Sequence, residues 1–190
     1  MLSETNIIFY YEWLGLDKNH FGILTMIADF GGKYKGNLSD MCRYLSLTVQ
    51  SNNRNKIKNY IDELKDSDHV TYEKSGNTYY LNIIPKATKI EMRRDWFITT
   101  KNHKSKSESV AWEQVLKTYL YCSFIGSEVI TTNAEISIAL NVSESVINSA
   151  KNVLKNEFCA IVVEVINVRE SDTRIRTIGH KIKCSAWWES

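Results

Sequence analysis

The chain has 190 residues, 43% of them hydrophobic and 11% aromatic, so it can build packed cores and is not disordered throughout. No apolar run approaches the roughly 18 residues of a membrane span, and the start lacks the basic and apolar regions of a signal peptide. We therefore expect a cytoplasmic protein without membrane contact. The formal net charge of +2 alone excludes no class of partner.

Charge is unevenly distributed along the chain. Residues 1–85 carry 9 basic and 10 acidic side chains, residues 111–190 carry 8 and 9, and residues 86–110 carry 7 and 3. The single proline, Pro85, precedes the basic stretch, which ends in linker-like composition. We expect two domains, 1–85 and 109–190, joined by a basic connector over 86–108.

Apolar spacing and capping residues predict three helices in the first domain. Asp17, Ser39 and Thr48 stand at their expected N-caps, and a short extended stretch separates the first two helices. Two β-like runs follow, 69–74 and 78–84, with hairpin turn chemistry between them. The first half thus predicts helix, strand, helix, helix and hairpin.

The second half repeats this order. Its expected N-caps are Ser109, then Thr132 or Asn133, then Ser143, again with a short extended stretch after the first helix. Two strands are expected to follow over 161–168 and 173–182. Two copies of one element order are stronger evidence than either copy alone.

The two copies also share a turn at an offset of 95 residues. Leu45-Ser46-Leu47-Thr48 matches Leu140-Asn141-Val142-Ser143. In each, an apolar residue ends one helix, a small polar residue turns, an apolar residue fills the corner and a hydroxyl caps the next helix. This pattern favours two helices that cross steeply around a dry corner.

On these residues the chain resembles the winged-helix superfamily. The stretches that carry the resemblance are Leu38-Ser39-x5-Leu45-Ser46-Leu47-Thr48 and Thr132-x7-Leu140-Asn141-Val142-Ser143. The resemblance implies an α+β, mainly helical chain of two tandem winged-helix domains, each a helix-turn-helix with a β-hairpin wing. Tandem winged helices are typical of plasmid and phage replication initiators and of some bacterial regulators, and the Asn/Lys/Ile/Tyr-rich composition resembles low-GC mobile elements.

The third helix of the first copy begins with amides and bases, and no acid appears before Asp62. The major groove requires such donors and acceptors, Arg or Lys for guanine and Asn or Gln for adenine. The alternative is a solvated helix face, rich in Asn because the genome is AT-rich. The expected DNA contacts, with two residues of the wing, are Thr48, Gln50, Ser51, Asn52, Arg54, Asn55, Lys58, Lys74 and Asn77.

The second copy and the connector offer fewer candidates. The second third helix carries Glu144 where a phosphate would approach, and its wing is balanced by Glu170 and Asp172. This copy therefore serves equally well as an assembly or dimerisation surface. Trp96 is expected to anchor the connector, and the aromatic run 7–14 is expected to pack on the first domain or form a dimer contact. The expected DNA contacts are Arg93, Arg94, Asn148, Lys151, Arg169, Arg174 and Arg176.

No pattern predicts an enzyme, a metal site or a cofactor site. The four histidines are scattered, and the sequence contains no HExxH, GxxxxGK[ST], GxGxxG or GxSxG motif. We expect a non-enzymatic double-stranded DNA-binding protein that acts as a transcriptional regulator or as a replication or transfer initiation factor of a mobile element. The alternative is a protein-interaction adaptor without DNA contact. A homodimer and a replication or transcription partner protein both remain open.

Overall fold

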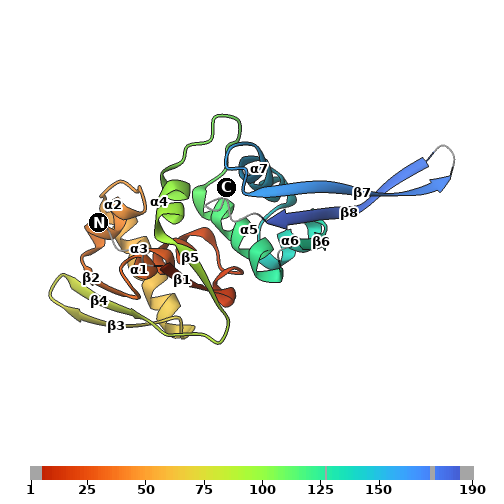
Figure 1. Ribbon diagram of the computed structural model, residues 1–190. Coiled ribbons are helices and arrows are strands. Elements are labelled where there is room, and N and C mark those ends of the chain that lie inside the picture. The colour runs from red at the N-terminus through yellow and green to blue at the C-terminus, as the bar shows by residue number, and fades with distance from the viewer. Residues whose placement is uncertain (1–5, 127, 172–173, 185–190) are drawn as a thin grey trace. The chain divides into compact units, whose positions relative to one another are not determined.

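The computed structural model describes residues 6–126, 128–171 and 174–184, with only the backbone at 168–176 and 178 (Figure 1). Within them the chain is α+β, with seven α-helices and three small antiparallel sheets. None of these helices is both long and apolar enough to span a bilayer. The chain divides into two compact units, Met1–Arg94 (unit 1) and Asp95–Ser190 (unit 2).

The first helix of unit 1 is largely buried, and both sheets of the unit pack against it. Phe9 and Phe21 stack at 6.4 Å between ring centroids, and Trp13 is fully buried beside Phe9. The aromatic run at the start of the chain thus packs on unit 1, as expected. The sheets have the strand orders β1-β5 and β2-β4-β3. The elements are β1 (Asn6–Tyr10), a 3-10 turn (Tyr11–Trp13), α1 (Lys18–Asp29), β2 (Lys33–Gly36), α2 (Leu38–Tyr44), α3 (Ser51–Asp66), β3 (Val70–Ser75), β4 (Thr78–Ile83) and β5 (Lys89–Arg93).

Unit 2 repeats the order of α1 to β4, and its sheet β6-β8-β7 has the same topology as β2-β4-β3. Its core includes a fully buried lysine: the Nζ of Lys117 donates to the carbonyl oxygen of Leu140 at 2.8 Å, at the end of the second helix of the repeat. The elements are α4 (Arg94–Asn102), α5 (Trp112–Ile125), β6 (Glu128–Thr131), α6 (Asn133–Leu140), α7 (Glu144–Asn156), β7 (Ile161–Ser171) and β8 (Arg174–Cys184).

The stretch expected as a connector is divided between the units. β5 pairs along its length with β1 in unit 1. In α4 the Trp96 ring is fully buried, 4.2 Å from Tyr119 and 6.4 Å from Phe158 between centroids, so it is the docking anchor of unit 2. The linker-like residues that follow are fastened to the end of α7, because the Glu157 carboxylate accepts from Ser105 at 2.6 Å and Ser107 at 2.7 Å.

The turn between the second and third helices is the same in both units. Ser46 and Asn141, 95 residues apart, are left-handed, with φ of 57° and 52°. The next amide donates back five residues in each case, Leu47 to the Cys42 carbonyl oxygen at 2.8 Å and Val142 to that of Ser137 at 3.0 Å. The corner is nevertheless not dry, because Leu47 is 37% exposed. The sequence match therefore predicted the turn correctly but not its burial.

Several helix starts differ from the sequence prediction. Asp17 caps α1, accepting from the Asn19 amide at 2.7 Å, as expected. Asn37 rather than Ser39 caps α2. The helix α3 begins three residues after Thr48 and has no side-chain cap. The last two differences concern unit 2: α5 starts after Ala111 instead of Ser109, and Ser143 precedes α7 without a capping hydrogen bond, whereas Thr132 and Glu135 form a full capping box on α6.

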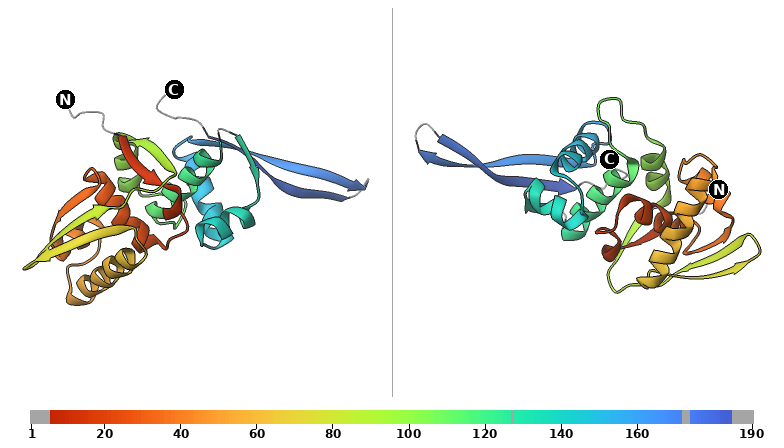
Figure 2. Two further views of the ribbon diagram at one scale, coloured as in Figure 1. Left: turned by 90° about the horizontal axis from the view of Figure 1, so that it is seen from below. Right: turned by 180° about the vertical axis from the view of Figure 1, so that it is seen from behind.

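The two hairpins differ most in length. In unit 1 the β3–β4 ladder runs one residue pair beyond the strand β2, to Ser75 opposite Thr78. In unit 2 the strands have 11 residues each and pair as far as Ser171 opposite Arg174, although β6 covers only 180–183 of β8. At about 3.3 Å per residue, β7 extends roughly 20 Å past the part that β6 covers. This extension, which we call the arm, is visible in Figure 2.

Candidate nucleic-acid interface

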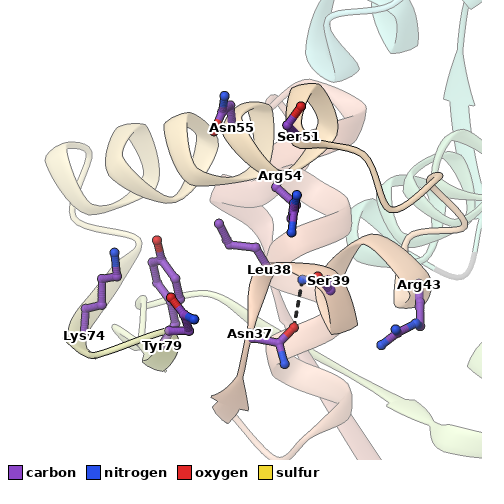
Figure 3. A pocket seen from close by; sticks show the side chains of 10 residues that line it. Asn37, Leu38, Ser39, Arg43, Ser51, Arg54, Asn55, Lys74 and Tyr79 are labelled. Atoms are coloured by element: carbon purple, nitrogen blue, oxygen red, sulfur yellow. Dashed lines mark hydrogen bonds between the residues drawn. The ribbon is translucent and has the colours of Figure 1, made fainter.

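A groove of about 600 Å³ opens on unit 1 where three elements meet (Figure 3). The start of α2, the first turns of α3 and the tip of the β3–β4 hairpin form its walls. Five of the residues predicted from the sequence as DNA contacts lie here together. The lining residues are Asn37, Leu38, Ser39, Arg43, Ser51, Arg54, Asn55, Lys74, Asn77 and Tyr79.

One face of α3 supplies the upper wall of the groove. Ser51, Arg54, Asn55 and Lys58 follow the spacing i, i+3, i+4 and i+7, which places them on the same side of a helix. The buried residues of α3, among them Ile57, lie on a different face and pack into the core. Hydrophobic spacing in the sequence therefore determines which polar side chains of α3 face outward.

The lower wall of the groove is fixed by a cap. The side-chain oxygen of Asn37 accepts from the Ser39 amide at 2.9 Å and the Asp40 amide at 3.0 Å, and so holds the first turn of α2 (Figure 3). Asn37 was not predicted, although Asn caps helices as well as Ser does and directly precedes Leu38. Arg43 and Tyr79 were not predicted either, because they join the groove only through the tertiary structure.

The groove is positively charged. Arg43, Arg54 and Lys74 line it, and no acidic residue does. Arg43 is shared with Asp40 in an exposed ion pair of 2.6 Å, and the Lys74 ammonium lies 5.4 Å from the centre of the Tyr79 ring. The chain carries four basic and no acidic side chains from 41 to 61. An anion entering the groove therefore meets Arg54 of α3 and Lys74 of the hairpin, whereas for Arg43 it competes with Asp40.

The residues predicted on α3 are free to bind a ligand. No hydrogen bond or ion pair joins their side chains to any other residue that the structure describes. Asn53 is different, because its amide donates to the Thr48 carbonyl oxygen at 2.9 Å and hydroxyl at 3.0 Å. Thr48 and Gln50 precede the helix α3 and do not lie on it. The free side chains are Gln50, Ser51, Asn52, Arg54, Asn55 and Lys58.

Two predicted arginines at the end of unit 1 lie outside the residues that line the groove. Arg94 pairs through Nε with the Asp29 carboxylate at 3.0 Å, and Asp29 also accepts from the Tyr44 hydroxyl at 2.8 Å. Arg93 stands in β5, opposite Asn6 of β1. Arg94 is thus committed to a structural contact, and a phosphate would have to compete with Asp29 for its guanidinium.

Unit 2 does not reproduce the groove. The hollow beside its turn, about 540 Å³, is lined by Ser137, Ile138, Asn141, Val142 and Ser143, none of them charged. On α7 the predicted Asn148 is exposed.

The prediction for Lys151 is wrong. Only 5% of the residue is exposed, and its Nζ donates to the Asn133 side chain at 2.9 Å. This burial also lowers the pKa of Lys151. In this conformation the ammonium cannot reach a phosphate, because it is buried against Asn133, the first residue of α6.

The predicted arginines of the second wing lie near the end of the arm. Arg176 stands opposite Val168, Arg169 opposite Ile175, and Arg174 opposite Ser171 in the β7–β8 ladder. Their side chains lie outside the described part of the structure, as do the residues of the turn itself. The ladder therefore places three arginine positions in the last few residue pairs before the tip.

No family model matches the chain, and no curated protein matches it. Among the described residues, no group of three or more His, Cys, Asp or Glu side chains is arranged to hold a metal ion. Its function is therefore inferred from the groove of unit 1 and from the contrast with unit 2.

Proposed function

We propose that the chain is a non-enzymatic double-stranded DNA-binding protein whose two units are winged-helix domains, and that unit 1 carries the DNA-binding surface. The repeated order of three helices, an early strand and a hairpin supports the domain assignment. The observation that carries the function is the groove, where Arg54, Lys74 and the unpartnered amide of Asn55 come together and none of the lining residues is acidic.

The dimensions of α3 suit this function. An α-helix with its side chains is about 10–12 Å across, and the major groove of B-DNA is about 12 Å wide. The start of α3 would enter that groove with Ser51, Arg54 and Asn55 toward base edges. Lys74 and Asn77 at the hairpin tip would then reach the sugar-phosphate backbone, which positions the protein without reading sequence.

The cellular role follows from occupying DNA rather than from a reaction. We propose transcriptional regulation or initiation of replication or transfer for a mobile element, the roles that the winged-helix resemblance implies. In each role the protein, once bound to a duplex, blocks or recruits other proteins.

Unit 2 favours a second role, contact with protein. Its hollow carries no charge, and two large apolar side chains stand out on its surface, Ile138 at 81% and Ile130 at 70% exposure. Contact with another protein would remove these two side chains from water, which is favourable. We expect Ile138→Ser to weaken self-association or partner capture while DNA affinity stays unchanged, measured by light scattering and fluorescence anisotropy on one preparation.

The proposed function is tested by fluorescence anisotropy on a labelled generic duplex, titrated with salt. For about five phosphate contacts, log K should fall against log salt with a slope of about −4 to −5, since each contact releases condensed counterions. A steep slope supports the proposal and justifies selecting the site from random sequence. No binding at low salt would overturn it in favour of a protein-interaction adaptor.

A further inference from the structure

Unit 1 exposes two aliphatic side chains where its DNA-binding surface begins. All residues from 46 to 52 are exposed, and among them Leu47 and Val49 are apolar, with 37% and 42% of their surface accessible. Four residues, 47–50, join the turn to α3, whereas two, 142–143, join the turn to α7 in unit 2. Unit 1 therefore has two additional residues in this segment, which we call the link.

The link is held in place by hydrogen bonds. The Leu47 amide donates to the Cys42 carbonyl oxygen at 2.8 Å, and the Gln50 amide donates to that of Thr48 at 2.9 Å. The Asn53 amide closes the link onto α3 through its two bonds to Thr48. Leu47 and Val49 are thus presented on an ordered backbone, so a ligand that packs on them need not pay to order it.

The neighbours of these side chains indicate which ligand they suit. Gln50, Asn52 and Asn55 carry amides without a partner in the described residues, and an amide pairs in two-point fashion with N6 and N7 of adenine. The thymine opposite that adenine displays a C5-methyl group, which aliphatic side chains contact. Residues 47–55 therefore combine exposed amides and aliphatic groups, the chemistry that reads an A·T pair.

We propose that Val49 and Leu47 pack on thymine methyl groups in the major groove, so that unit 1 selects A·T pairs beside the start of α3. This inference rests on the proposed function and adds a specificity to it. The acid-free charge of 41–61 favours DNA over a protein as the occupant of this surface. A protein partner is the competing occupant, and the experiment distinguishes the two.

The test uses the full chain and a duplex selected from random sequence. Replacing each thymine in turn by deoxyuridine removes one methyl group and leaves base pairing and phosphates intact. We expect the affinity for the duplex to fall about fourfold at each contacted position, which corresponds to ~0.8 kcal/mol for one buried methyl or methylene group. Val49→Ser and Leu47→Ser should bind the thymine duplex more weakly and lose the difference between thymine and deoxyuridine.

The matched control is Val142→Ser, because Val142 in unit 2 stands at the position that matches Leu47 in unit 1. It should keep the difference between the two duplexes, and none of the three variants should change the salt slope, because no phosphate contact is removed. Equal wild-type affinity for thymine and deoxyuridine at every position would overturn the inference while leaving DNA binding in place. So would a loss of self-association in the link variants with the difference retained. Failure to bind any duplex would overturn the proposed function itself.

Discussion

The same turn lies beside two different surfaces in the two units. Asn37 and Thr132 cap the second helix at positions 95 residues apart, and the left-handed Ser46 and Asn141 follow at the same offset. Within that shared frame, the position of Arg43 in unit 1 is taken by the exposed Ile138 in unit 2. The turn is set by backbone geometry and capping, so the outward side chains are free to determine what each unit binds.

The hairpins extend the contrast. The β3–β4 hairpin ends where Lys74 and Asn77 can line the groove. In unit 2 the arm instead continues for about six residues past the part of the sheet that β6 covers, and there β7 and β8 pair only with each other. One ladder topology thus yields a groove wall in unit 1 and a projecting ribbon in unit 2.

The largest expected effect separates the two cores. Ile61 in α3 and Leu154 in α7 are both fully buried. We expect Ile61→Ala to lower the free energy of unfolding of unit 1, and Leu154→Ala that of unit 2, each by about 2–5 kcal/mol, because the lost contacts leave a cavity. Differential scanning calorimetry should show one transition moving in each variant. Movement of both transitions together would mean that the units unfold as one.

The next effect separates the two third helices by charge. Arg54→Glu with Lys58→Glu should lower duplex affinity at least about tenfold and make the salt slope less steep by about 2, because two cations are lost. Asn148→Glu with Lys155→Glu on α7, both exposed, is the matched control and should change little. Anisotropy measures affinity, and circular dichroism verifies folding. Equal losses in both double variants would contradict the assignment of DNA binding to unit 1.

Acid should weaken unit 2 through one carboxylate. Hydrogen bonds from Ser105 and Ser107, with His103 at 2.6 Å, lower the pKa of Glu157 from 4.5 to about 2. A lowered pKa in the folded state stabilises it above the ordinary value, and this contribution is lost as the pH falls from about 4.5 toward 2. Glu157→Gln should be less stable than wild type at neutral pH and equally stable near pH 2. Urea unfolding monitored across that range measures this, and a constant difference would refute it.

The smallest expected effect compares the two turns. Glycine adopts left-handed φ without strain, whereas Ser46 does not, and asparagine tolerates this region better than most residues. Ser46→Gly should therefore stabilise unit 1 by less than about 1 kcal/mol, and Asn141→Gly should stabilise unit 2 by less still. Thermal unfolding of both variants measures the order. A larger gain at Asn141 than at Ser46 would contradict the expectation that the serine is the more strained of the two residues.

Local patterns in the sequence predicted what local physics determines. Helical spacing, the Asp17 cap and the turn at offset 95 all appear in the structure, and the exposed face of α3 follows from the burial of Ile57 and Ile61. The pairing of β1 with β5 was not predicted, because it joins residues 79 to 87 positions apart in the chain and neither segment carries a signal for the other. The complete lining of the groove was not predicted for the same reason, because Arg43 and Tyr79 come to line one groove with Arg54 only after folding.

The buried Lys117 makes unit 2 observable by chemical labelling. Acylating reagents react only with lysines that solvent can reach. The ammonium of Lys117 is buried and donates a hydrogen bond to the Leu140 carbonyl oxygen. Its modification therefore requires unit 2 to open, whereas the exposed Lys74 in the groove reacts at once and is shielded by any bound ligand. One mass spectrum of a labelled sample would thus record the opening of one unit and the occupancy of the other.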